Sequence, residues 1–423
     1  MEFIERQEKI PVKTSVDVLV AGSGPAGVSA AIAASRMGAE TMIIEQLGAL
    51  GGISTSGLMS HWTGNAESRI YKEILQKSAE RNEGEFAGKI TKTIDPEKLK
   101  TLYFDLLEDV SVRLYTFVSG VVMEENTIKG VIVESKSGRE AILAKVVIDA
   151  TGDGDVAAKA GAAYVKGRES DGKMQPVTSM FKVGGVDYDR AAFLSAFEET
   201  YDTEKGELQH LAHQKLTHPL GHVLLYRTTL PGIVTCNMTN LIDVDGTSAE
   251  QLSAAEKACR RQIDEIIPFL REFVPGYERC FLIDSASLIG VRETRHFKGL
   301  YTLTEQDILE ARVFEDWVVR DAYFSFDVHN ISGSGLDETG VQKYFSQEKG
   351  YTIPYRCLIP EKIDGLLLSG RNISSTHMAH SNFRAMPICS ATGEAAGTAA
   401  ALSCRAGVAV REVCPADIQK ALL

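Results

Sequence analysis

The stretch VDVLVAGSGPAGVSAAIAASRMGAETMIIE, residues 16–45, decides the fold. Residues 16–21 are a short apolar run, which is typical of a strand buried on both faces. The glycine-rich GSGPAG follows at 22–27, and the small residues at 28–38 predict a helix that packs close to a sheet. TMIIE, residues 41–45, predicts the next strand. Strand, glycine turn, helix and strand together form a βαβ unit of ~30 residues.

The glycine turn predicts a phosphate-binding loop. Gly22, Gly24 and Gly27 have the spacing that allows a tight turn, close approach of a pyrophosphate to the backbone, and close helix packing. Pro25 and Ala26 open the helix that follows. Its N-terminus offers free N–H groups and a partial positive charge to phosphates. The loop therefore predicts a dinucleotide site.

Glu45 and the segment after it favour FAD over NAD. A carboxylate at Glu45 accepts hydrogen bonds from a ribose and repels the additional phosphate of NADP. Gln46 then opens the segment QLGALGG, which ends in Gly51 and Gly52. A second close-approach segment there suits a cofactor that continues past the pyrophosphate toward a flavin.

Two later segments support the same cofactor. VVIDATGDGD, residues 146–155, is a buried strand that delivers a small turn to the cofactor edge. GLLLSGR, residues 365–371, and the small-residue helix after 386–393 return to the first domain. A helix N-terminus there can stabilise the negative charge that a reduced flavin develops. No further G-x-G-x-x-G follows a predicted strand, so electrons must come from the substrate, a diffusing donor or a partner protein.

The chain of 423 residues predicts about two domains of α/β class. A discontinuous Rossmann-like FAD-binding domain would comprise residues 1–165 and 346–423, with an inserted α+β cap or substrate domain at 166–345. In the first part we expect helices at 67–83 and 96–110, followed by a small antiparallel meander. In the insert we expect helices at about 190–200 and 249–271, and strands within HVLLYRTTL and GIVTCNMTN.

Composition excludes several classes of protein. The net charge of -12 argues against a nucleic-acid surface, which needs a basic patch. No apolar run reaches the ~18 residues of a membrane span, and the charged N-terminus has no signal-peptide stretch, so we expect a cytoplasmic protein. The seven cysteines contain no C-x-x-C pair, so we expect neither an iron–sulfur cluster nor any other metal.

Nearly the whole chain, about residues 16 to 405, resembles the FAD-dependent oxidoreductase family (the FAD_oxidored type). The resemblance rests on the residues quoted above and on MQPVTSMF, GVRETR, HFKGLYTLTEQD, IPYRCLIP and LLLSGRNISSTHMAHSNFRAMPICSATGEAAG. That family is distantly similar to fumarate reductase and succinate dehydrogenase flavoproteins and to the flavin subunit of heterodisulfide reductase. The resemblance implies FAD in a Rossmann-like domain with a cap that closes over the flavin, and no defined substrate.

The resemblance also assigns residues to the cofactor. Besides the positions above, it implies FAD contacts for Ala150, Thr151, Gly152, Asp153, Gly370, Arg371, and Thr392 and Gly393 near a helix start. Related flavoproteins often have an acid where this chain has Arg371, so ribityl recognition would rest on backbone groups. Succinate dehydrogenase flavoproteins attach FAD through a histidine just before the paired glycines. QLGALGG contains none, so the resemblance implies non-covalent FAD.

Candidates for the reacting centre lie close to these motifs. His61 follows the glycine segment, on the expected ring side. Arg292, Glu293 and Arg295 lie in GVRETRH. An arginine there can clamp a carboxylate with two hydrogen bonds, but an ion-pair network that holds the cap explains the motif equally well.

A second group of candidates precedes the C-terminal helix. His377, His380 and Arg384 lie in THMAHSNFRAMP, and a histidine so placed can shuttle a proton near neutral pH. Cys389 precedes the expected helix start, which would lower its thiol pKa. Asp327 and His329 in SFDVHN are weaker candidates for the reacting centre.

The leading functional hypothesis is an FAD-dependent oxidoreductase that dehydrogenates or reduces a small molecule, with an external electron donor or acceptor. Three alternatives stay open at this point. They are a flavin-containing electron-transfer subunit of a larger complex, a flavin monooxygenase, and a non-catalytic FAD-binding protein.

Overall fold

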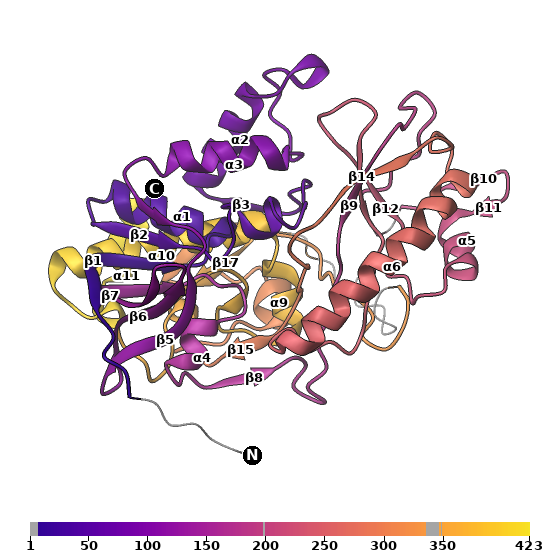
Figure 1. Cartoon of the computed structure of the whole chain (residues 1–423). Helices are drawn as coiled ribbons and strands as arrows, with labels where there is room; N and C mark the ends of the chain where they lie inside the picture. The colour runs from indigo at the N-terminus through magenta and orange to yellow at the C-terminus, as the bar shows by residue number, and fades with distance from the viewer. Residues whose placement is uncertain (1–6, 198, 336–346, 348) are drawn as a thin grey trace.

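The computed structural model describes residues 7–197, 199–335, 347 and 349–423. A large mixed sheet organises the N- and C-terminal parts of the chain (Figure 1). Its strands are β1 (Val12–Ala21), β2 (Thr41–Ile44), β4 (Ser111–Arg113), β5 (Phe117–Glu124), β6 (Thr127–Ser135), β7 (Gly138–Asp149) and β18 (Leu366–Leu368). The order is β4-β2-β1-β7-β6-β5, and β18 pairs with β7.

Strand β7 has two different partners on the side away from β1. Its first half pairs antiparallel with β6, with Leu143 opposite Gly130, and completes the expected meander. Its second half pairs in parallel with β18, with Val147 opposite Leu366. The sheet therefore joins residues more than 200 positions apart, and the carboxyl ends of β1, β7 and β18 meet at one edge. In open parallel sheets this edge is where ligands bind.

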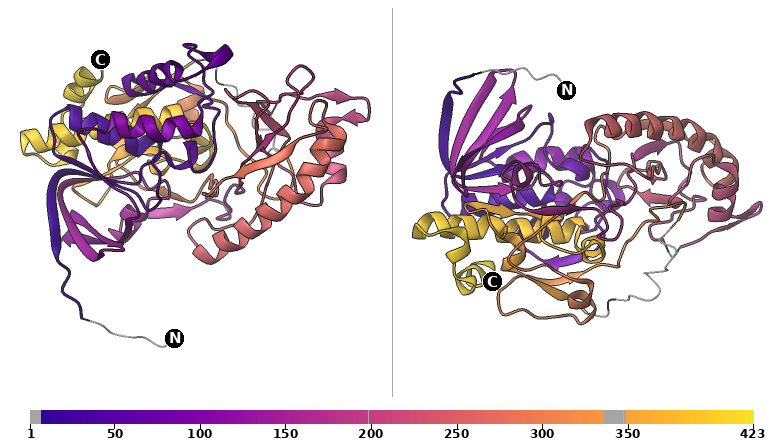
Figure 2. Two further views of the ribbon diagram at one scale, coloured as in Figure 1. Left: turned by 45° about the horizontal axis from the view of Figure 1, so that its top comes forward. Right: turned by 90° about the horizontal axis from the view of Figure 1, so that it is seen from below.

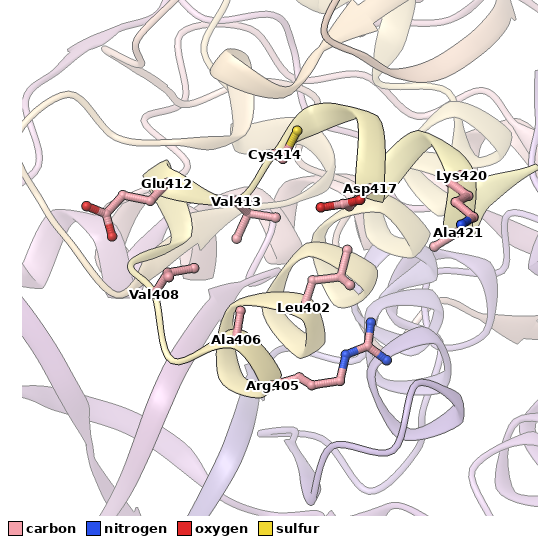
Figure 3. Close-up of a pocket in the computed structure, with 10 residues that line it drawn as sticks. All are labelled: Leu402, Arg405, Ala406, Val408, Glu412, Val413, Cys414, Asp417, Lys420 and Ala421. Carbon is pink, nitrogen blue, oxygen red and sulfur yellow. The ribbon is translucent and has the colours of Figure 1, made fainter.

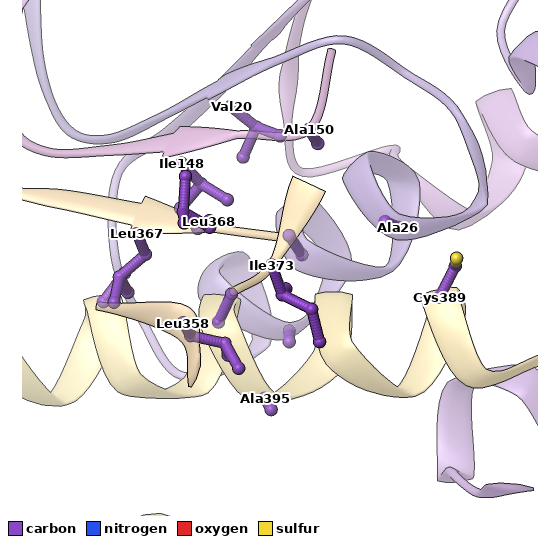
Figure 4. Packing of buried hydrophobic residues seen from close by; sticks show 14 of the residues in the cluster. Val20, Ala26, Ile148, Ala150, Leu358, Leu367, Leu368, Ile373, Cys389 and Ala395 are labelled. Carbon is purple, nitrogen blue, oxygen red and sulfur yellow. The ribbon is translucent and has the colours of Figure 1, made fainter. Parts of the chain in front are cut away.

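Two helices pack on each other beside this sheet, α1 (Pro25–Arg36) and α10 (Met386–Ala406). Gly393 and Gly397 form the contact, because a Cβ on them would lie 2.0 Å from Ala26 O and 2.1 Å from Ala30 O. Figure 4 shows the buried side chains between the strands and α10. Further helices of this region are α2 (Arg69–Glu80), α3 (Pro96–Leu106), α4 (Asp155–Lys159), α9 (His377–Phe383) and α11 (Pro415–Leu422).

A second sheet has the strand order β12-β13-β9-β14 and a hydrophobic core of its own, drawn from residues 181–280. Its strands are β9 (Phe181–Gly184), β12 (Leu224–Arg227), β13 (Val234–Asn237) and β14 (Phe281–Ser285). The helices α5 (Leu208–Lys215) and α6 (Ala249–Phe273) belong to it, beside a short β10–β11 hairpin (Asp202–Thr203 and Gly206–Glu207). Figure 2 shows this lobe beside the large sheet, with α6 along it.

One expected helix of the insert is wrong. No helix forms over 190–197; Leu194 instead pairs with Leu225 and extends the second sheet. Ala192 N donates to Pro275 O, so tertiary hydrogen bonds replace the helical ones. The expected helix at 249–271 is confirmed by α6.

Short strands form two further small sheets. β8 (Tyr164–Lys166) pairs with β15 (Arg295–Phe297). A three-stranded sheet consists of β3 (Asn65–Glu67), β16 (Trp317–Tyr323) and β17 (Tyr351–Pro354). Helix α7 (Glu305–Leu309) lies between β15 and β16 in the sequence. Within the described part of the chain, no helix combines the length and the apolar character needed to cross a membrane.

Candidate functional site

The loop between β1 and α1 leaves room for a phosphate group. Gly22 has a φ of +90°, and a Cβ there would lie 2.5 Å from Ala150 O. A Cβ on Gly27 would lie 1.9 Å from Gly22 O, so both glycines are needed for packing. A Cβ on Gly24 would meet no atom within 4 Å. No side chain caps α1, so its first N–H groups face this open space, which is the arrangement that binds a pyrophosphate.

Glu45 is buried beneath this loop and is already engaged with it. Ser23 donates its backbone N–H and its hydroxyl to Glu45 Oε2, at 2.9 and 2.7 Å. Leu47 N donates to Oε1 at 2.9 Å. A carboxylate offers about four acceptor positions, so one stays available to a ribose hydroxyl. Gln46, in contrast, is exposed.

The second glycine turn packs directly on the first. Gly51 has a φ of +106° and donates its N–H to Ser23 O at 2.7 Å. A Cβ on Gly52 would lie 3.2 Å from Gly24 Cα. The two turns thus form one continuous surface. A cofactor that extends beyond its pyrophosphate toward a flavin requires such a surface.

The turn after β7 depends on Asp149, which is not among the predicted site residues. Its buried carboxylate accepts hydrogen bonds from Thr151 N, Thr151 Oγ1 and Ala157 N. Burial raises the pKa of Asp149 to about 6. Asp149 could have been found in the sequence as an acid at the end of a fully buried strand, since a buried carboxylate must accept hydrogen bonds from the turn that follows.

Asp153 and Arg371, both predicted cofactor residues, pair with each other at 3.0 Å. Thr294 Oγ1 donates a hydrogen bond to Asp153 Oδ1, the oxygen that Arg371 contacts. Arg295 Nη1 donates to the backbone oxygen of Asp153 and to Asp155 Oδ1. Arg295 therefore belongs to an ion-pair network between the two parts of the chain. One nitrogen of Arg371, Nη1, is buried and has no partner among the described residues.

The predicted helix start at Thr392 and Gly393 is wrong. Helix α10 begins at Met386, so both residues lie two turns inside it. Thr392 Oγ1 accepts a hydrogen bond from Gly370 N at 3.0 Å, and Gly393 packs on α1. The spacing of Gly393 and Gly397 in the sequence is typical of close helix packing and could have indicated that both lie inside a helix. Among the described residues no side chain caps the real N-terminus, so the first-turn N–H groups other than that of Pro387, which has none, can face a ligand.

Cys389 lies in the first turn of α10 and is buried. Its Sγ donates to Arg384 O at 3.4 Å. Burial raises the pKa of this thiol to about 12, which outweighs the helix terminus. The expectation of a lowered pKa is wrong, because desolvation disfavours the thiolate.

A group that we name the two-arginine cluster lies beside this helix start. It consists of Arg292, Arg384, Asp327 and His329. Arg384 Nη2 donates to Asp327 O and Oδ2, at 2.9 and 2.6 Å, and His329 Nε2 lies 3.4 Å from Asp327 Oδ1. Burial, and after it the charge of Arg384, lowers the pKa of Arg292 to about 10. Tertiary structure thus joins residues 292, 327, 329 and 384, which lie in separate motifs.

His61 lies at the edge of this cluster. Its ring stacks on Tyr226 with centroids 5.3 Å apart, and Tyr226 interacts electrostatically with Asp327 and Arg292. Burial, followed by the charge of Lys92, lowers the pKa of His61. The side chain is only partly buried, so a neutral imidazole here can accept a proton.

Glu293 faces away from its neighbour Arg292 and forms a buried triad with His296 and His377. Its Oε1 accepts from His296 Nε2 at 2.7 Å and from His377 Nδ1 at 2.6 Å. Burial would raise the pKa of Glu293, but these two hydrogen bonds hold it well below its ordinary value. Burial opposes the charged form of His377, yet Glu293 raises its pKa.

The triad is the one group of close His, Cys, Asp and Glu ligand atoms found in the described part of the chain. Ligands around tetrahedral zinc, with bonds of ~2.0 Å, lie ~3.3 Å apart. The observed distances of 2.6 and 2.7 Å are those of hydrogen bonds. His380 lies edge-on to His296, and burial lowers its pKa well below the ordinary value.

A surface pocket lies at the opposite end of α10 (Figure 3). It is lined by Leu402, Arg405, Ala406, Val408, Glu412, Val413, Cys414, Asp417, Lys420 and Ala421. At 1.5 Å per residue, Leu402 is about 24 Å along the helix from Met386. The pocket is therefore separate from the two-arginine cluster.

Residues 17–422 match the family model described as FAD dependent oxidoreductase. The chain belongs to this family. It is an oxidoreductase, and its cofactor is FAD. The search of curated proteins found no match.

Solved structures show weaker similarities. A geranylgeranyl bacteriochlorophyll reductase-like protein from Thermoplasma acidophilum is 14% identical, with a TM-score of 0.46, and the match covers 96% of this chain and 82% of that one. The flavin-dependent brominase Bmp2 is 12% identical, with a TM-score of 0.48 over 96% and 83%. The p-nitrophenol 4-monooxygenase of Pseudomonas putida is 12% identical, with a TM-score of 0.42 over 69% and 70%.

Proposed function

We propose that this oxidoreductase binds FAD non-covalently across the two glycine turns and exchanges a hydride with a small molecule held at the two-arginine cluster. One observation carries the proposal. The uncapped start of α10 lies two residues after Arg384, so a site for the electron-rich end of a flavin adjoins a charged cluster. A Cβ on Gly290, two residues before Arg292, would lie 3.4 Å from Ile53, which follows the second glycine turn.

The residues that would hold FAD are those of the two glycine turns with Glu45, the turn at Ala150–Asp153, Gly370 and the start of α10. The open space at Gly24 and the free N–H groups of both helices support this assignment. When bound, FAD supplies a two-electron donor or acceptor. The absence of a histidine in residues 46–52 supports non-covalent binding.

We also propose that residues 166–345 are a cap inserted into the FAD-binding domain of 1–165 and 346–423. The separate core of the second sheet, drawn from residues 181–280, supports an insert, whereas apolar residues from 297–328 pack in the core of the large sheet. In the proposed reaction Arg292, from the insert, and Arg384, from the C-terminal part, orient the substrate together. His61 accepts the proton that leaves the substrate when the hydride departs, or returns it in the reverse direction.

The test is anaerobic flavin reduction with purified holoenzyme. We expect a yellow protein whose flavin is released by acid and identified as FAD. A panel of small metabolites, with NADH and NADPH, should contain a compound that bleaches the visible absorption of the oxidised flavin. A colourless protein that cannot be reconstituted with FAD would overturn the proposal, as would a flavin that no compound reduces.

An aerobic assay and a test for co-purifying proteins separate the alternatives. Oxygen consumption coupled to NADPH oxidation, with a hydroxylated product, would support a monooxygenase. Reduction that requires a co-purifying protein would support an electron-transfer subunit. An external electron donor or acceptor and a cytoplasmic location stay proposals, the second supported by the net charge of -12.

A further inference from the structure

The two-arginine cluster contains more positive than negative charge. Arg292 and Arg384 are both largely buried, and the carboxylate of Asp327 pairs with Arg384 at 2.6 Å and interacts electrostatically with Arg292. Burial and the charge of Arg292 lower the pKa of His329 to about 4, so this ring is neutral near pH 7. The cluster therefore has one unbalanced positive charge. A buried charge without a partner is costly, so a site of this kind is stabilised by an incoming anion.

Several donors of the cluster have no acceptor. Among the described residues, the one hydrogen bond of the Arg292 guanidinium is from Nη1 to Pro176 O, at 2.6 Å. A guanidinium has five N–H donors. Arg384 Nε is buried and has no partner in the described part of the chain, and the same holds for Gln175 Nε2.

Gln175 connects these donors to the cluster. Its Oε1 accepts a hydrogen bond from His329 N at 3.2 Å, which fixes the side-chain amide beside the histidine. Its backbone N–H donates to Glu293 at 2.9 Å. Buried donors without acceptors are rare in folded proteins, and two of them, Arg384 Nε and Gln175 Nε2, beside one excess positive charge indicate a missing acceptor.

We infer that the two-arginine cluster binds the carboxylate of a small organic acid, and that this acid is the substrate of the flavin. The inference rests on the proposed function and names its substrate class. A carboxylate carries one negative charge and so neutralises the cluster, whereas a phosphate monoester would leave it negative. The planar guanidinium of Arg292 matches a carboxylate with two parallel hydrogen bonds. The oxidisable or reducible carbon of the acid then lies toward the start of α10.

The test titrates holoenzyme with pairs of probes, each a small carboxylic acid and its neutral amide, and with inorganic phosphate. Binding is followed by the change in the flavin absorption spectrum. We expect at least one acid to bind with saturation, while its amide and phosphate bind at least about tenfold more weakly. This comparison needs no variant and so does not depend on folding.

The variants Arg292→Gln and Arg292→Lys localise the effect. The first should weaken binding of the acid at least about tenfold and the second by less, because lysine keeps the charge without the paired donors. FAD content should not change in either variant. Arg261→Gln, an exposed arginine on α6, is the matched control and should bind the acid as the parent does.

Three results would overturn the inference: no acid perturbs the flavin, the amides bind as well as the acids, or Arg292→Gln binds the acid unchanged. A neutral compound that bleaches the flavin equally well in the parent and in Arg292→Gln would overturn this inference and still support the proposed function. A protein that cannot bind FAD would overturn the proposed function itself.

Discussion

Ser23 donates both its backbone N–H and its hydroxyl to a single oxygen of Glu45, at 2.9 and 2.7 Å. The acid at the end of β2 thus holds the glycine loop at the end of β1 in addition to any contact with a ribose. Leu47 N on the other oxygen completes a carboxylate that is buried and has backbone donors on both sides.

Glu45→Gln should therefore weaken FAD binding. The amide NH2 of glutamine would face either the N–H of Ser23 or that of Leu47, so one donor loses its acceptor. We expect the FAD dissociation constant to rise about tenfold or more, measured by titrating apoprotein and following flavin fluorescence. Glu108→Gln, at an exposed position, should have no effect. An unchanged constant for Glu45→Gln would mean that the acid does not organise the loop.

Alanine at Gly24 should affect FAD binding, whereas alanine at Gly393 should affect the stability of the fold. Gly24 has a φ of -63° and open space in front of it, so Gly24→Ala should fold normally and lose FAD affinity at least about tenfold. A Cβ on Gly393 would collide with Ala26 O, so Gly393→Ala should lower the free energy of unfolding by about 1–3 kcal/mol. Urea denaturation of both apoproteins measures the difference. A stable Gly393→Ala would contradict the close packing of α1 and α10.

The pair of Glu293 and His377 should make stability depend on pH. The pKa of His377 is raised above its ordinary value of 6.5, against the effect of burial, by Glu293. Its contribution is therefore complete below pH 6.5 and is lost as the pH rises through the raised pKa. Between about pH 6 and about pH 9, the parent should lose more unfolding free energy than His377→Gln does.

Denaturant unfolding at several pH values measures this loss. Comparison with His377→Gln cancels the other titrating groups, and His210→Gln, on the surface, should behave as the parent does. Parallel curves for the parent and His377→Gln would show that the histidine is neutral in the folded protein.

Cys389 should be chemically inert despite its place in the first turn of α10. Burial raises its thiol pKa to about 12, whereas Cys414 is exposed. A thiol reagent should modify Cys414 rapidly in native protein and reach Cys389 only after unfolding, as peptide mass spectrometry would show. Cys389→Ser should leave flavin reduction unchanged. Fast labelling of Cys389 in native protein would contradict the raised pKa of this thiol.

Much of the fold followed from local patterns. The βαβ unit, the antiparallel meander and helix α6 depend on runs of apolar residues and on glycines that only certain turns accept. The expected helix at 190–200 failed because hydrogen bonds to distant strands replaced the local ones. The start of α10 was misplaced because Thr392 and Gly393 were interpreted as a helix start beside the flavin, although Gly393 packs against Ala26 of α1.

The sequence by itself determined the cofactor, since the glycine turns and Glu45 carry their chemistry within a single segment of chain. Tertiary structure decided how the polar candidates divide. Arg292 and Glu293 are neighbours in sequence but point to different partners, Arg292 to the group around Arg384 and Glu293 to His377. Arg384 and His377 lie 92 and 84 positions further along the chain than Arg292 and Glu293, so only the folded chain brings these partners close. The glycine loop therefore indicated a dinucleotide, Glu45 and the second glycine turn favoured FAD, and the assembled arginines point to the substrate.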